Sequence, residues 1–204
     1  MNAVAWQVQS LSMGYPDHDL VARVPLLRAV TRAVPEPVAA PLRPFFDHVE
    51  ATPLTALAAD YVATFDHRKR FSPYLTYFAY GDTRKRGMAL LRFKHAYRAA
   101  GLEPDDGELP DHLAVVLEFA ATADERVGRK LLLEHRAGLE LMRLGLREAG
   151  SPWAGVLESV SATLPPMGGR DHEAVARLAA QGPPEEEVGL APFAPPEFMP
   201  GGRR

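Results

Sequence analysis

The chain has 204 residues, of which 47% are hydrophobic and 24% are charged, a balance typical of one globular domain rather than a disordered chain. It has no cysteine, which excludes disulfide frameworks, thiolate metal sites and cysteine nucleophiles. The net charge of −3 argues against general nucleic-acid binding. No apolar run reaches the roughly 18 residues of a transmembrane span, and no signal-peptide pattern opens the chain. We therefore expect a cytoplasmic protein without stable membrane insertion.

Apolar residues recur at spacings of three and four almost throughout, which predicts an all-α domain of eight or more helices. Pro25 should kink the second helix or delay its start. Asp124 and Gly150 bracket the longest expected helix. In chain order, the helices are expected near 4–13, 20–30, 45–49, 53–65, 74–80, 83–100, from 110, and near 125–149, 152–164 and 171–180.

Residues 1–182 are thus predicted to form a single all-helical domain. The remainder, 183–204, is rich in Pro, Gly and Glu, and its aromatic residues Phe193 and Phe198 are isolated. Such a composition cannot bury enough apolar surface to offset the entropy of ordering. We therefore predict a flexible, disordered C-terminal tail.

The sequence contains none of the common catalytic or cofactor-binding motifs. The seven histidines are scattered without HExxH or paired Glu-x-x-His spacing, and the chain has no GxGxxG, P-loop or GxSxG motif. His135 lies on a leucine stripe and is best interpreted as a core histidine. The sequence therefore predicts a protein that is not an enzyme and holds no metal or permanently bound cofactor.

A basic segment, 66–100, carries nine Lys or Arg against two Asp or Glu. Within it, Arg84, Lys85 and Arg86 occupy the expected first turn of a helix, where the helix dipole disfavours positive charge. A solvated surface explains such a triplet most simply, and contact with an anionic group is the functional alternative. The segment also supports an alternative function, a helical DNA-binding regulator.

The stretch from Glu108 to His112 combines a proline, a carboxylate and an imidazole at an expected helix start. Pro110 and Asp111 suit the first turn, where Asp111 would accept free amides. This purely structural role does not account for His112, which could hold polar groups of a peptide or a cation. An acid–base pair of Asp111 and His112 in an enzyme is a third possibility, but no nucleophile, metal or cofactor motif accompanies it.

Several motifs resemble those of one known family, the NarJ-type nitrate reductase molybdenum cofactor assembly chaperones. The main one is YLTYFAYGDTRKRGM at 74–88, and ELPDHL at 108–113 and VLEF at 116–119 follow it in order. LSMGYP at 11–16 and YVATFD at 61–66 fit the same pattern upstream. The resemblance covers about residues 4–165 and leaves out the tail.

The resemblance implies an all-helical, system-specific chaperone in the cytoplasm. Such a chaperone binds the N-terminal segment of the apo catalytic (alpha) subunit of nitrate reductase. It assists insertion of the molybdenum guanine dinucleotide cofactor before membrane docking, with cofactor-biosynthesis proteins as possible further partners, and it is not part of the final enzyme.

Site residues follow from the same resemblance and from the aromatic pattern. The wider family carries a Pro-Asp-His element near its peptide groove, which maps onto Pro110, Asp111 and His112. Aromatic side chains on neighbouring expected helices could accept the apolar face of an amphipathic helix. The predicted client-binding residues are Tyr61, Phe65, Tyr74, Tyr77, Phe78, Glu108, Pro110, Asp111 and His112, although half or more of the aromatic ones are expected to be plain core.

Overall fold

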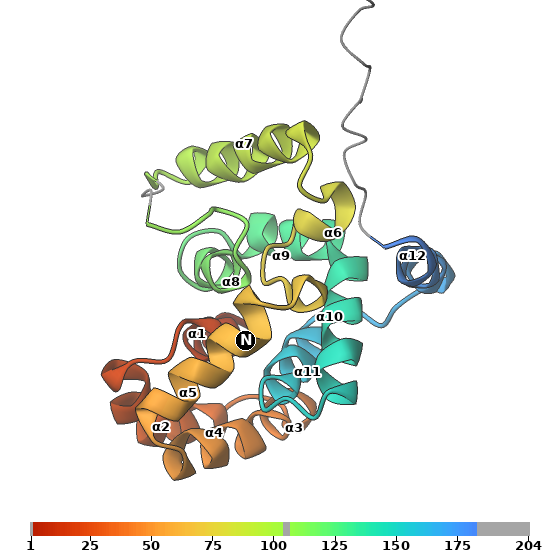
Figure 1. The fold of residues 1–204 in the computed structure, drawn as a ribbon. Coiled ribbons are helices and arrows are strands. Elements are labelled where there is room, and N and C mark those ends of the chain that lie inside the picture. The colour runs from red at the N-terminus through yellow and green to blue at the C-terminus, as the bar shows by residue number, and fades with distance from the viewer. Residues whose placement is uncertain (1, 104–106, 183–204) are drawn as a thin grey trace, which may run out of the picture.

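The computed structural model describes residues 2–103 and 107–182, and the predicted tail lies outside them. Within these ranges the regular structure is helical, apart from one isolated β-bridge, which confirms the all-α prediction (Figure 1). The α-helices are α1 (Asn2–Met13), α2 (His18–Thr31), α3 (Glu36–Ala39), α4 (Leu42–Ala51), α5 (Leu54–Tyr61), α6 (Tyr77–Tyr80), α7 (Arg84–Ala99), α8 (Leu113–Thr122), α9 (Glu125–Glu134), α10 (Arg136–Glu148), α11 (Ala154–Thr163) and α12 (Gly169–Gln181). A π-helical turn, η1 (Val62–Asp66), and a 3-10 turn, η2 (Lys69–Phe71), follow α5.

The first helix lies at the centre of the bundle and joins distant parts of the chain. It packs chiefly against α8, α11 and α2. Two of its buried side chains make hydrogen bonds to α11: the Trp6 indole donates to Thr163 Oγ1 at 2.9 Å, and Gln9 donates to Ser159 at 2.8 Å. Because these hydrogen bonds are shielded from water, they fix the register of α1 against α11 as well as stabilising the contact.

The long helix expected at 125–149 is in fact two helices, because the chain turns at His135, which ends α9. The apolar spacing continues across the break, since Leu132, Leu139 and Met142 are all buried. Periodicity therefore gave no sign of it. After the turn, Arg136 is buried and donates to Glu140 of the same helix at 2.7 Å and to the Pro165 carbonyl at 3.2 Å. The second contact joins residues 29 positions apart, which local pattern does not encode.

Other boundaries also differ from the sequence prediction. The second helix starts at His18, capped by Asp17, and runs through Pro25, so the delayed start is wrong. The helix expected from residue 74 begins only at Tyr77, and the one expected at Pro110 begins at Leu113. Both late starts have one cause: the residues just before these helices pair with each other in extended conformation.

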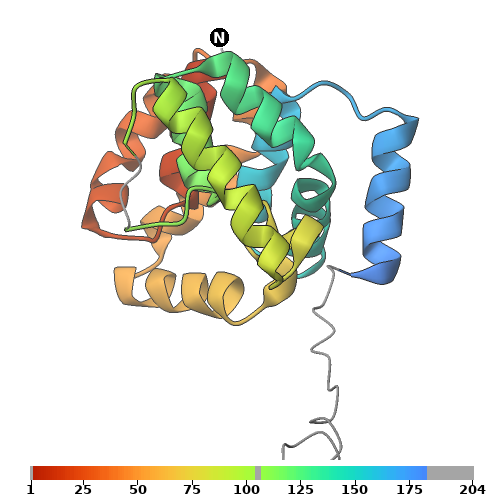
Figure 2. The same ribbon diagram turned by 90° about the horizontal axis from the view of Figure 1, so that it is seen from above.

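The last described helix stands on the outside of the bundle (Figures 1 and 2). It packs on α10, and none of its residues is buried. Across the described ranges, no helix is both long and apolar enough to span a bilayer.

Candidate functional site

Two segments far apart in the chain meet as an isolated antiparallel bridge between Tyr74 and His112. The Leu75 amide donates to the Asp111 carbonyl at 3.0 Å, and the Leu113 amide donates to the Pro73 carbonyl at 2.9 Å. We call the bridge segments 73–76 and 110–113, together with Arg86, the junction. It fixes the start of α8 against the chain that leads into α6.

Asp111 is the buried centre of the junction, with no exposed surface. Its Oδ2 accepts hydrogen bonds from the Thr76 amide at 3.1 Å and from the Thr76 hydroxyl. Arg86 donates through Nε to the same hydroxyl oxygen at 3.1 Å, and its Nη2 lies 3.9 Å from Asp111 Oδ2. Asp111 Oδ1 and Arg86 Nη2 are buried without a hydrogen-bond partner. A desolvated ion pair of this kind is costly to break from one side.

This network explains why a basic residue occupies the first turn of α7. Thr83, rather than an acidic residue, precedes the helix, and its side chain makes no capping hydrogen bond. The anionic partners of Arg86 are the chain's own carboxylates, Asp111 and, at 3.4 Å, Asp82. Arg84 and Lys85 are exposed, and their contact with an external anion stays a prediction.

His112 caps α8 and is 4% exposed. Its Nδ1 accepts the Ala114 amide at 3.2 Å, so the proton of the neutral ring lies on Nε2. The ring meets the Tyr74 ring edge-on at a centroid distance of 5.3 Å. Burial lowers the pKa of His112, against the opposing charges of Glu108, Asp111 and Asp66. Asp111, expected in the first turn of this helix, therefore lies before it, and the side chain that accepts a free amide at the helix start is that of His112.

The outward side of the junction presents a phenol and a carboxylate. The Tyr74 hydroxyl donates to Glu108 Oε1 at 3.1 Å, and the guanidinium of Arg86 lies 5.4 Å from the Tyr74 ring centroid. Burial and Glu108 raise the pKa of Tyr74 to about 12, which keeps its hydroxyl protonated. Of the predicted site residues at the junction, Glu108 is exposed and Tyr74 is half-buried, so these two are the ones a partner can reach.

The remaining aromatic candidates are mostly core. Tyr61 and Phe65 pack with ring centroids 4.7 Å apart, and both meet Trp153 edge-on. Tyr77 and Phe78 on α6 are 8% and 5% exposed. This agrees with the expectation that half or more of these rings are core, and a role for any of them in binding stays a prediction.

Two residues that hold the junction together were not predicted from the sequence. Thr76 bridges Asp111 and Arg86, and the Tyr97 hydroxyl of α7 donates to the Pro110 carbonyl. Neither lies in a motif that points to its partner. The one available signal was the disfavoured position of Arg86, which indicated that some anion holds it there.

The basic segment 66–100 is largely paired with acidic side chains. Its ion pairs include Lys69–Asp82, Arg70–Glu148, Arg86–Asp82, Arg86–Asp111, Arg92–Glu134 and Arg98–Glu103. This pairing gives the DNA-binding alternative no support. In the part of the chain that the structure describes, no group of three or more His, Asp or Glu could hold a metal ion.

A family model described as "Nitrate reductase delta subunit" matches residues 31–158, which include the whole junction. The chain belongs to the nitrate reductase delta subunit family. The match ends within α11, so α12 lies beyond it. The resemblance stated from the motifs is confirmed by this match and by the relatives below.

Two relatives with descriptive names are similar to this chain over about four fifths of its length. The chain is 41% identical over 174 residues to "Nitrate reductase-like protein NarX" of Mycobacterium tuberculosis. The aligned region covers 81% of this chain and 25% of that protein. The chain thus spans a quarter of that relative. It is 31% identical over 169 residues to "Probable nitrate reductase molybdenum cofactor assembly chaperone NarJ" of Bacillus subtilis, over 82% of this chain and 92% of that one.

A solved structure supports the fold. The chain resembles a redox enzyme maturation protein from Archaeoglobus fulgidus with a TM-score of 0.57 and 21% identity, over 88% of this chain and 94% of the other. At this identity the likeness concerns the arrangement of the helices.

Proposed function

We propose that this member of the nitrate reductase delta subunit family is an assembly chaperone for a nitrate reductase. It binds the N-terminal segment of the apo catalytic subunit in the cytoplasm and holds that subunit while the molybdenum guanine dinucleotide cofactor is inserted. It acts before membrane docking and is neither an enzyme nor part of the finished complex. The observation that carries this proposal is the likeness to a NarJ chaperone over 92% of that protein's length.

The geometry is consistent with binding rather than catalysis. Asp111 and His112, the candidate acid–base pair, are both buried and committed to structural hydrogen bonds. The accessible groups beside them, Tyr74 and Glu108, offer an aromatic edge and a carboxylate to a peptide. The cofactor is cargo destined for the client, and cofactor-biosynthesis proteins are the further partners this role requires.

The test is a calorimetric titration of the full chain with a synthetic peptide. The peptide comprises the first fifteen residues of the nitrate reductase catalytic subunit encoded by the same genome. We expect saturable 1:1 binding with a negative heat-capacity change, because an apolar helix face is buried on binding. A scrambled peptide of the same composition is the matched control.

Heat is the appropriate signal, because Trp6 and Trp153 are fully buried and report poorly on a surface event. Equal heats from the native and scrambled peptides, or none from either, would contradict the proposal.

A further inference from the structure

Helix α10 is apolar on two faces, and only one of them belongs to the core. Leu139, Met142 and Leu146 are buried on the inner face. On the outer face, Leu141 is half-buried and Leu144 is 37% exposed. A helix with a second apolar stripe needs something to cover it.

Two glycines of α10 let aromatic rings settle beside that outer stripe. A Cβ at Gly138 would lie 2.7 Å from the Phe78 ring, and a Cβ at Gly145 would lie 2.9 Å from the Phe71 ring. Only glycine allows these rings to come so close to the helix backbone. The result is a largely apolar channel, here called the outer groove, with a floor of Phe78, Leu141, Leu144 and Gly145 and with the Arg70–Glu148 ion pair also in its lining.

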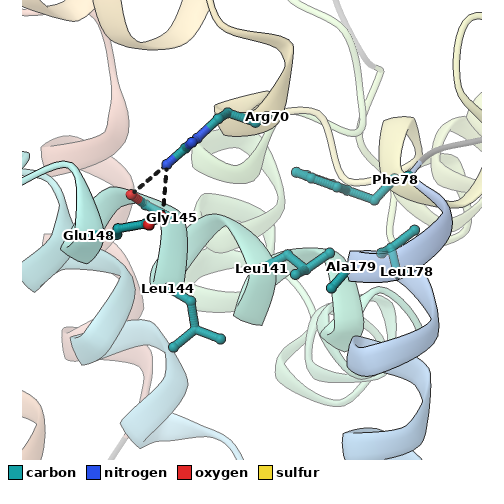
Figure 3. Close-up of a pocket in the computed structure, with 9 residues that line it drawn as sticks. Arg70, Phe78, Leu141, Leu144, Gly145, Glu148, Leu178 and Ala179 are labelled. Carbon is teal, nitrogen blue, oxygen red and sulfur yellow. Dashed lines mark hydrogen bonds and ion pairs between the residues drawn. The ribbon is translucent and has the colours of Figure 1, made fainter.

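Helix α12 sits in the outer groove without filling it. A cavity of about 530 Å³ remains between Leu178 of α12 and the groove floor, and Figure 3 shows Leu178 and Ala179 facing Leu141 and Phe78 across it. A second cavity, of about 370 Å³, lies on the side of α12 that faces Glu134 and His135. Cavities of this size are typical of sites that hold a ligand.

The attachment of α12 is shallow. None of its residues is buried, and Leu178 is the residue of α12 that packs against the main core cluster. Its capping contact is local, from the Gly168 amide to Asp171 at 2.8 Å. The linker before it is anchored separately, by Arg136 donating to the Pro165 carbonyl at 3.2 Å. α12 can therefore leave the groove while its tether stays in place.

We propose that α12 is a displaceable cover, and that an amphipathic helix of the client docks in the outer groove in its place. The inference builds on the proposed chaperone function and adds where the client helix binds and what it must displace. The occupant is a helix with Leu- or Phe-sized residues at i, i+3, i+4 and i+7, bulkier than the alanine-rich face of α12.

Three features favour this occupant. The resident α12 already shows that the groove accepts a helix, with Ala174, Val175 and Leu178 turned partly inward. The unfilled volume beside it gives larger side chains a contact area that α12 does not use. The groove is also lined by Phe78 of α6, an aromatic residue that the sequence analysis placed in a peptide groove.

The test compares charge substitutions on two faces of α12 in the full chain. Leu178→Glu unseats the cover, whereas Ala176→Glu places the same charge on an exposed outward position. The probe is the fifteen-residue client peptide, titrated by calorimetry. We expect Leu178→Glu to bind it about threefold or more tightly than the native chain, because removing a competing closed state raises apparent affinity. Ala176→Glu should match the native chain.

A third variant tests the groove itself. Leu144→Glu places a charge on the groove floor and should weaken the peptide at least about tenfold, since an unpaired charge would be desolvated on docking. If the peptide binds and all three variants behave alike, the site lies elsewhere and this inference is overturned while the chaperone function stands. If neither the native chain nor Leu178→Glu binds the peptide, both are overturned.

Discussion

The junction and α12 hold their parts of the molecule by opposite means. At the junction, Asp111, Thr76 and Arg86 form a buried polar network, and two backbone hydrogen bonds tie the segments together. At α12, a single leucine meets the core and cavities remain beside it. A buried network of hydrogen bonds and opposite charges favours one geometry, whereas a shallow apolar contact opens at low cost. The comparison indicates a rigid frame and, within the described residues, a labile helix attached to it.

The largest expected effect comes from breaking the junction. Asp111→Ala leaves Thr76 without its buried acceptor and Arg86 without its buried counter-charge, and it should cost about 3–5 kcal/mol of unfolding free energy. Urea denaturation followed by circular dichroism measures it. Glu118→Ala, on the exposed side of α8, is the control and should stay within about 0.5 kcal/mol of the native chain. Equal midpoints for the two variants would mean that the network contributes little.

The cap at the start of α8 is the next test. His112→Ala removes the acceptor for the Ala114 amide and should cost about 1–2 kcal/mol. His112→Asn keeps a capping acceptor and should recover part of that loss. If His112→Ala left stability unchanged, the cap would be unimportant and a purely binding role for His112 would gain weight.

The junction should also make stability depend on pH. Burial holds the pKa of His112 below its value in the unfolded chain, so the unfolded state binds more protons as the pH falls. Stability is therefore complete above about pH 6.5 and decreases below it. Urea midpoints at pH 7.5 and 5.5 should differ less in His112→Asn than in the native chain. The exposed His172→Asn serves as control, and the slope that remains is expected from His135, whose pKa burial also lowers.

The smallest effect on stability is expected at α12. Leu178→Ala should cost less than about 1 kcal/mol because the residue is only half-buried. Leu146→Ala, on the buried face of α10, should cost about 2–5 kcal/mol. Similar losses for the two would show that α12 is an integral part of the core and would remove the contrast between the regions.

Sequence pattern was informative where structure is local. Helical spacing, the Asp124 cap and the left-handed Gly150 with φ +65° all follow from neighbouring residues, and they predicted the helical class correctly. The break at His135 and the pairing of Thr76 with Asp111 join residues whose contact depends on the whole bundle. No periodicity or capping rule encodes such contacts. The sequence therefore identified the Pro110-Asp111-His112 motif but not the contacts that these residues make.

The outer groove was missed for a related reason. Leu141 and Leu144 are visible in the sequence as extra apolar residues on α10, and 171–180 as a short helix, but nothing local pairs one with the other. The cavities arise because α12 fills the outer groove incompletely, and this can be seen only in the packed structure.

Hydrogen–deuterium exchange of the full chain, with and without the client peptide, tests the central claim most directly. We expect slow exchange at the start of α8, whose amides follow the junction, and faster exchange in α12. On saturation with peptide, α12 should lose further protection, because a displaced helix of 13 residues is only marginally stable alone. The amides of α10 should become more protected. Protection in α12 that equals that of α8, or that rises when the peptide binds, would contradict the account.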